Sequence, residues 1–152
     1  MLRDSLNQAL KEAMKAKDTR RTATLRLILA ALKDRDIAAR TDGADRTGIP
    51  DDQILSMLQT MVRQRRESIA MYEQGGRADL VEQEKEEITI IEGFLPKQMD
   101  EAEIKAAAEA AVAEIGAQGI KDMGKVMGAL KGKYAGKMDF GKASAILKAL
   151  LS

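Results

Sequence analysis

The segment from Lys121 to Lys137 carries the residues best suited to bind a ligand. Glycine recurs in it every fourth residue, at positions 124, 128, 132 and 136, so a helix would align these glycines along one side. Lysines are interleaved with the glycines, and closely spaced lysines attract phosphate groups. One aromatic ring lies among them and could stack on a base. The candidate nucleic-acid contacts are Lys121, Gly124, Lys125, Gly128, Lys131, Lys133, Tyr134 and Lys137.

The glycine row admits two explanations. Each glycine inside a helix costs about 1 kcal/mol relative to alanine, so several in one helix need a reason. A smooth stripe lets another backbone approach closely. That backbone is either a neighbouring helix, with Val126 and Leu130 as ordinary core, or a sugar-phosphate chain. Residues 121–152 hold seven lysines against two aspartates, a formal charge of +5, which favours phosphate, although lysines also keep helices soluble.

The sequence lacks the side chains that most often perform catalysis. It contains no cysteine and no histidine, so the commonest general base, metal ligand and nucleophile are missing. We therefore expect a protein that is not an enzyme, with no catalytic residue, no metal and no cofactor. The acidic run from Glu82 to Glu87 is expected to be a solvated helix face, because its carboxylates point in different directions around a helix.

Arg65 stands where the apolar spacing of its helix calls for a core residue. Such an arginine must be satisfied by a partner. The favoured explanation is an ion pair with a carboxylate of the acidic run, for example Glu84 or Glu87. The alternative is a contact with a bound anion.

Apolar residues recur at three- and four-residue intervals along most of the chain, which predicts an all-α fold. A helical N-terminal bundle is expected over residues 1–96, and a small three-helix C-terminal subdomain over residues 97–152. Residues 41–50 are polar, with two glycines and one proline, and predict a loop.

Several helix starts are predicted from capping residues. A break near Lys17 separates the first two helices, unless one longer bent helix runs through it. The expected caps are Asp18 or Thr19 at this break, the capping boxes Asp79 with Glu82 and Asp100 with Glu103, and Asp139 before the last helix.

The amino-terminal residues alternate charged with apolar side chains and contain no signal-peptide core. No apolar run approaches the ~20 residues that a bilayer requires. We therefore expect a cytoplasmic protein without a membrane partner.

Several segments resemble the GatB/YqeY family, and the resemblance extends over essentially the whole chain. The Phe-Leu-Pro and Lys-Asp-Met-Gly-Lys-Val-Met motifs are the more specific parts. The matching segments run from Leu25 to Lys33, Arg63 to Ile69, Gly76 to Leu80, Glu92 to Gln98 and Lys121 to Met127.

This resemblance implies a two-part all-α fold that holds tRNA by its body, as does the tail of the tRNA-dependent amidotransferase B subunit. A family-level description would read carbon–nitrogen ligase with glutamine as amido-N-donor, but nothing in the chain resembles the phosphorylating cradle or the amidase segment of that enzyme. The expected function is a non-catalytic tRNA-binding accessory module. The alternative is a helical protein-interaction module that docks on an aminoacyl-tRNA synthetase or an amidotransferase.

Overall fold

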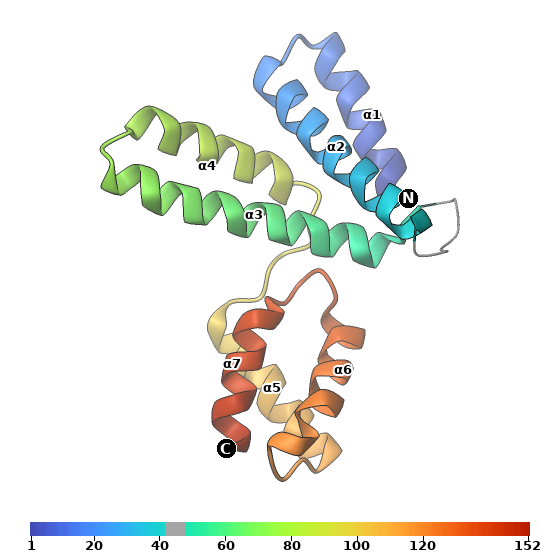
Figure 1. Ribbon diagram of the computed structural model, residues 1–152, viewed down its shortest axis with the longest axis vertical. Coiled ribbons are helices and arrows are strands. Elements are labelled where there is room, and N and C mark those ends of the chain that lie inside the picture. The colour runs from blue at the N-terminus through green and yellow to red at the C-terminus, as the bar shows by residue number, and fades with distance from the viewer. Residues whose placement is uncertain (42–47) are drawn as a thin grey trace. The chain divides into compact units, whose positions relative to one another are not determined.

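A computed structural model describes residues 1–41 and 48–152 of the chain (Figure 1). Over these residues the chain forms seven α-helices and one short 3-10 helix, and no β-strand. The predicted all-α fold is confirmed. The loop predicted over residues 41–50 falls mostly on residues 42–47, which lie outside the described part of the chain.

The described chain divides into two compact units, Met1–Leu95 and Pro96–Ser152. The N-terminal unit contains α1 (Leu2–Lys15), α2 (Thr19–Thr41), α3 (Asp51–Gln74) and α4 (Ala78–Glu92). Helix α1 packs along α2, and α3 along α4, while α2 also packs against α4 (Figure 1). The largest fully buried side chains of this unit are apolar: Leu6, Leu25, Ile28, Ile54, Met57, Leu58 and Ile91.

The break between α1 and α2 depends on two residues. Lys17 adopts a left-handed backbone conformation with φ of 58°, which no α-helix can continue. The side chain of Asp18 then accepts a hydrogen bond from the backbone N–H of Arg21 at 3.1 Å, as an N-cap does. The predicted break is therefore confirmed, with Asp18 as the capping residue.

Helix α4 begins differently from the prediction. Its N-cap is Arg77, whose side chain caps nothing, so the predicted capping box of Asp79 with Glu82 is wrong. Asp79 lies inside the first turn, and its carboxylate binds the Arg77 guanidinium at 3.1 Å instead. This hydrogen bond from Arg77 holds the pKa of Asp79 below its ordinary value. A carboxylate in a first helical turn is also favoured by the helix dipole.

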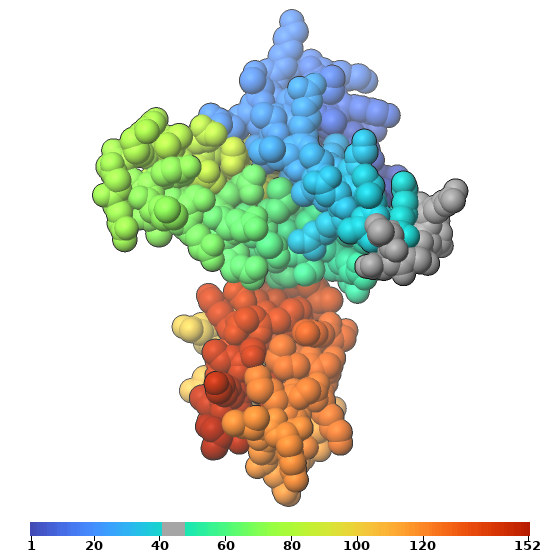
Figure 2. All heavy atoms as spheres, in the orientation of Figure 1, coloured from blue at the N-terminus to red at the C-terminus, as the bar shows by residue number. Residues whose placement is uncertain are grey.

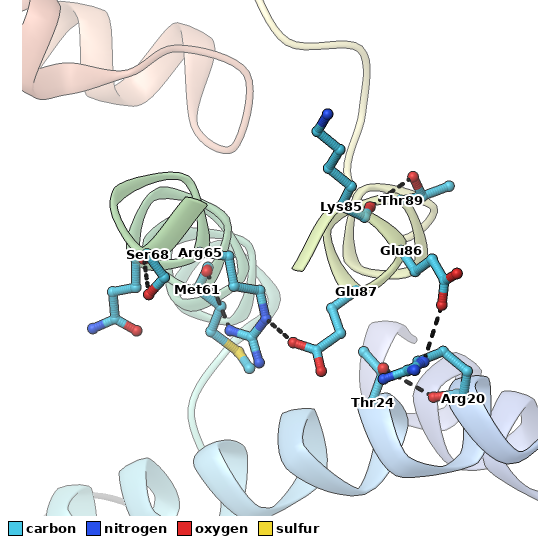
Figure 3. Close-up of polar contacts among 10 residues, drawn as sticks. Arg20, Thr24, Met61, Arg65, Ser68, Lys85, Glu86, Glu87 and Thr89 are labelled. Carbon is cyan, nitrogen blue, oxygen red and sulfur yellow. Dashed lines mark hydrogen bonds and ion pairs between the residues drawn. The ribbon is translucent and has the colours of Figure 1, made fainter. Parts of the chain in front are cut away.

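Arg65 joins α3 to α4 through an ion pair. Its Nε lies 3.0 Å from Oε2 of Glu87, and its Nη1 donates to the carbonyl oxygen of Met61 at 3.2 Å (Figure 3). Both charged side chains are nearly buried, with 14% and 10% of their surface exposed. The predicted pairing of Arg65 with the acidic helix is confirmed.

The acidic run is less solvated than predicted. Glu87 is buried, because its position on α4 faces α3. Burial also raises the pKa of Glu84, and the neighbouring Glu87 carboxylate raises it further, while Arg65 opposes both effects. Glu86 instead reaches Arg20 of α2, with 3.0 Å between Arg20 Nε and Glu86 Oε2 (Figure 3). The run therefore ties α4 to both neighbouring helices.

A second polar contact joins the start of α1 to the end of α2. The Arg3 guanidinium binds both carboxylate oxygens of Asp36 and donates to the carbonyl oxygen of Ile49 at 3.0 Å. Asp36 Oδ1 also accepts the backbone N–H of Ile49 at 2.9 Å. Gly48 has a φ of 95°, and a Cβ there would lie 2.5 Å from Arg3 Nη2. We call this group the Arg3–Asp36 clasp.

The C-terminal unit contains α5 (Glu101–Ile115), the 3-10 helix η1 (Ile120–Asp122), α6 (Met123–Tyr134) and α7 (Phe140–Leu151). The capping box of Asp100 with Glu103 is confirmed, with reciprocal hydrogen bonds of 2.8 and 3.1 Å. Asp139 caps α7 as predicted, accepting the N–H groups of residues 141 and 142. The fully buried core residues are Ile104, Ala108, Val126, Leu130, Met138, Ala143 and Leu147.

Replacing Arg65 with alanine should lower the free energy of unfolding of the N-terminal unit by about 3 kcal/mol, because Glu87 would remain buried without its partner. The double variant Arg65→Met with Glu87→Leu should recover most of this loss. Urea denaturation followed by circular dichroism measures both. A double variant no more stable than Arg65→Ala would contradict the pairing as the source of the effect.

The Arg3–Asp36 clasp predicts a pH dependence of stability. Hydrogen bonding by Arg3 holds the pKa of Asp36 below its ordinary value, against the opposing effect of burial. The contribution of Asp36 is therefore fully present above the ordinary carboxyl pKa and is lost as the pH falls through the lower folded value. Asp36→Asn should cost about 2 kcal/mol at neutral pH. This difference between the two proteins should shrink in denaturation experiments near pH 3, a value below the ordinary carboxyl pKa of ~4, and a constant difference would contradict it.

Candidate nucleic-acid interface

Helix α6 presents the predicted contact residues on its outer side. Val126 and Leu130 are buried against the C-terminal core, with Met123 and Met127 packed beside them. The helical repeat turns the opposite side of α6 outward. This outward side, which we call the glycine face, carries Gly124, Lys125, Gly128, Ala129 and Gly132, all exposed.

The glycine face does not serve packing within the C-terminal unit. A Cβ atom added at Gly124, Gly128 or Gly132 would meet no atom within 4 Å. A neighbouring helix of the described chain is therefore excluded as the reason for these three glycines. The space in front of the α6 backbone is open, and atoms of α6 lie at the surface of the C-terminal unit (orange, Figure 2).

Gly136 departs from the predicted row. Helix α6 ends at Tyr134, and Gly136 has a φ of 79°, which places it in a turn. Its carbonyl oxygen accepts a hydrogen bond from Gln98 Nε2 at 2.6 Å, and the backbone N–H of Met99 binds the carbonyl oxygen of Lys137 at 2.9 Å. Three of the four glycines therefore lie on α6, and Gly136 lies in the turn that fixes the end of the helix. Gln98 therefore positions the end of α6, and the spacing of apolar residues gives no sign of this contact.

Lysines surround the glycine face. Lys121, Lys125, Lys131 and Lys133 are exposed, and Lys137 is exposed in the turn after the helix. Lys131 and Lys133 fall on opposite borders of the face by the helical repeat. Among the described residues none of these lysines forms an ion pair. Their ammonium groups are therefore available to an anionic ligand.

Asp122 is the one carboxylate within the Lys121–Lys137 segment, and it has a structural task. Its Oδ2 accepts the backbone N–H of Gln118 at 3.0 Å, which closes the turn before α6. This hydrogen bond holds the pKa of Asp122 below its ordinary value, and the positive charges of Lys121 and Lys125 lower it further. Asp122 offsets part of the lysine charge, and the segment remains net positive.

Tyr134 lies at the edge of this region rather than on the glycine face. Its side chain is half-buried and packs against the C-terminal core. The Nζ atom of Lys133 lies 5.5 Å from the centre of its ring, within the range of a cation–π contact. The structure therefore brings the lysines and Gly124, Gly128 and Gly132 together, and leaves the tyrosine largely engaged with its own unit.

Other features of the described residues lie apart from this interface. An open groove of about 560 Å³ between α5 and α7 contains none of the predicted contacts. No three histidine, cysteine, aspartate or glutamate side chains in the described chain come together to hold a metal ion. None of the described helices has the length and apolar character needed to cross a membrane.

Comparison with known proteins gives related chains in yeasts. The chain is 37% identical over 90 residues to "Altered inheritance of mitochondria protein 41, mitochondrial" of Eremothecium gossypii, which is 59% of this chain and 46% of that protein. The protein of the same name from Lachancea thermotolerans is 36% identical over 104 residues, 67% of this chain and 53% of the relative. The chain thus spans about half the length of these relatives, whose names describe no reaction.

These relatives contradict the cytoplasmic location expected from the sequence, because their names place them in mitochondria. The expectation depended on a missing secretory signal and a missing apolar span. Mitochondrial import uses amphipathic, arginine- and serine-rich segments, which neither criterion detects.

A family model described as "Yqey-like protein" matches residues 3–151. This match confirms the resemblance seen in the motifs, since it includes all of them. The chain therefore belongs to the Yqey-like protein family.

Proposed function

We propose that this chain is a non-catalytic accessory protein that binds tRNA through sugar-phosphate contacts at the glycine face of α6. The observation that carries this proposal is the exposure of Gly124, Gly128 and Gly132, in front of which the space is open. The lysines around them supply the charge that phosphates require.

The exposed glycines are costly for the fold. Each destabilises the helix by about 1 kcal/mol relative to alanine, which would fit at all three positions without a clash. Packing therefore gives no reason for glycine at these positions. A residue that breaks a local rule without a structural gain points to function. A ligand backbone that approaches α6 more closely than a Cβ atom permits would supply the reason.

The chemistry of the face favours contact with the nucleic-acid backbone over contact with bases. Base stacking needs an accessible aromatic ring, and Tyr134 is half-buried with Lys133 beside it. Lysines on a smooth helix contact phosphates without reading sequence. Binding should therefore be modest in affinity, sensitive to salt and tolerant of tRNA sequence.

Two further observations support the proposal. The chain belongs to the Yqey-like family. Its motifs also resemble the tail of the amidotransferase B subunit, and this resemblance implies a part that holds tRNA. The sequence has no histidine or cysteine, and the names of the curated relatives describe no reaction. The family membership and the lack of these catalytic side chains support a role in binding rather than in catalysis.

Gly128→Ala should stabilise the C-terminal unit by about 0.5–1 kcal/mol, because alanine favours the helix and meets no neighbour. Hydrogen exchange of the α7 amides in the full chain measures this change. Gly116→Ala is the matched control. Its site is equally open, but a φ of 73° should make alanine destabilising by about 1 kcal/mol. Destabilisation by Gly128→Ala would show that this glycine serves the fold.

A larger side chain at the same place tests the binding role. Gly128→Gln adds an uncharged helix-forming residue, so folding should be retained while tRNA affinity falls roughly tenfold by exclusion of the ligand backbone. Filter binding at low salt gives the affinity, and hydrogen exchange verifies folding. Unchanged affinity in a folded Gly128→Gln protein would argue against close approach at α6.

Replacing Lys121, Lys125, Lys131 and Lys133 together with glutamate should reduce tRNA affinity by roughly tenfold or more and flatten its salt dependence. The matched control replaces four exposed lysines of the same unit, Lys97, Lys105, Lys142 and Lys148, and changes the net charge equally. Equal losses in both variants would mean that net charge alone attracts the RNA. No binding of bulk tRNA by the unmodified protein at low salt would overturn the proposal.

A further inference from the structure

The two helical hairpins of the N-terminal unit carry opposite charge. Residues 2–41, which span α1 and α2, hold ten lysines and arginines against five aspartates and glutamates, a formal charge of +5. Residues 51–92, which span α3 and α4, hold five against ten, a formal charge of −5. Figure 2 shows the blue atoms of α1 and of the start of α2 in a different area of this unit from the green atoms of α3 and α4. The unit therefore has a basic part and an acidic part.

This separation of charge does little to hold the two hairpins together. Among the residues that the structure describes, one ion pair joins them, between Arg20 of α2 and Glu86 of α4. The other ion pairs of the unit lie within one hairpin or the other. Eight of the ten cationic side chains of the α1 and α2 hairpin are exposed. Most of its positive charge therefore faces solvent and can act on a ligand.

Half of these cations surround the turn between α1 and α2, within residues 11–21. Lys11 and Lys15 are one helical turn apart on α1, on the side opposite the buried Leu6 and Ala13, and both are exposed. Lys17 follows in the turn and is exposed as well. None of the three lysines forms an ion pair with a described residue. We call Lys11, Lys15 and Lys17 the basic tip.

The other charged residues of this segment are already engaged. Asp18 caps α2, and Glu12 accepts a hydrogen bond at 3.3 Å from a side chain of its own helix. Arg20 is ion-paired, and the guanidinium of Arg21 lies 5.8 Å from the centre of an aromatic ring. The three lysines of the basic tip are therefore the cations of this segment that remain available to a ligand.

Lys17 occupies a position that suits glycine. Its φ of 58° is left-handed, a conformation that a side chain makes unfavourable and that glycine adopts freely. Glycine is the residue that most often ends a helix in this conformation. The dipole of α1 favours a cation at the end of the helix, which accounts for Lys15, but Lys11 lies before the last turn. A lysine where glycine would serve the turn better points to a use for its charge.

Phosphate groups are the ligand that this chemistry fits best. Protein interfaces centre on a buried apolar patch with few charged residues, and the basic tip has only Met14 exposed beside it to form one. Nucleic acids gain affinity from neutralised phosphates without any apolar contact. The carboxylates of α3 and α4 repel RNA from the other hairpin and so direct it to the basic tip.

We propose that the basic tip is a second contact for the sugar-phosphate backbone of RNA, in addition to the glycine face. This inference rests on the proposed function, since tRNA is the RNA concerned, and it extends that function to the N-terminal unit. Phosphates lie over the whole surface of a tRNA, so contact with both units requires no sequence readout. Two basic surfaces on one chain make binding more dependent on salt than the glycine face would alone.

Replacing Lys11, Lys15 and Lys17 together with glutamine tests the proposal in the full chain. Affinity for bulk tRNA at low salt should fall roughly tenfold, because three phosphate contacts are lost. The slope of log affinity against log salt concentration should become shallower by about two to three. Filter binding over a series of salt concentrations measures both, and circular dichroism verifies folding.

A matched control removes the same charge elsewhere on the N-terminal unit. Arg35, Arg63 and Lys85 are exposed, lie away from the turn between α1 and α2, and form no ion pair with a described residue. Their replacement with glutamine should change tRNA affinity by less than about twofold. Equal losses in the control and the basic-tip variant, or an unchanged salt slope in the basic-tip variant, would overturn the proposal.

Lys17→Gly separates binding from folding. Glycine suits the left-handed turn, so hydrogen exchange of the α1 amides should slow roughly fivefold. Loss of the charge should nevertheless lower tRNA affinity about threefold. A Lys17→Gly protein that exchanges more slowly but binds tRNA as tightly as the unmodified chain would show that this lysine contacts no RNA.

The two RNA surfaces can fail separately. If only the variant with glutamate at 121, 125, 131 and 133 loses affinity, the glycine face stands and the basic tip is not a contact. If only the basic-tip variant loses affinity, the basic tip stands and the glycine face fails. Salt-sensitive self-association without RNA, measured by sedimentation and absent from the basic-tip variant, would identify the acidic hairpin of a second copy as the occupant and overturn the proposal.

Discussion

Burial of one apolar stripe per helix is the constraint that organises both units. With four aromatic residues in the chain, the cores depend on aliphatic side chains and alanine, so each helix must present its stripe accurately to its neighbours. Helices α1, α3 and α5 follow this rule and serve as architecture. Helix α6 follows it on its inner side but leaves bare backbone outside. This exposed backbone of α6 is where a ligand is expected, because packing within the fold does not explain it.

The same constraint determined what could be predicted from sequence. The apolar spacing around Arg65 showed that this side chain had to lie near the core, and the acidic run along the chain supplied its partner. Asp100 with Glu103 and Asp139 could be assigned because a capping residue acts on its own first turn. The predicted capping box of Asp79 does not form, because the Asp79 carboxylate binds the guanidinium of Arg77 instead. A capping pattern in the sequence does not show such a competing partner.

The direction of the glycine face could not be obtained from spacing. Glycine at every fourth residue and a core stripe of Val126 and Leu130 are compatible with the same helix. The sequence therefore allowed either a neighbouring helix or a ligand to pack against the glycines. The tertiary structure excludes a neighbouring helix of the described chain, because the space next to Gly124, Gly128 and Gly132 is open. It also moved Gly136 out of the helix, since the side chain of Gln98 holds that turn from a distant part of the sequence. The spacing of residues along the sequence cannot predict a contact between positions so far apart in the chain.

The bare backbone of α6 has a further chemical consequence. Each helical carbonyl oxygen uses one lone pair for the helix and keeps another, which side chains normally shield. Gly124, Gly128 and Gly132 themselves have no side chain to cover the adjoining carbonyl oxygens, and no other element of the described chain comes within 4 Å of the place that a Cβ atom would occupy. A ribose 2′-hydroxyl is a donor that could reach such an oxygen, and deoxyribose has none. Missing side chains would thereby give this surface a means of distinguishing RNA from DNA that its lysines alone do not provide.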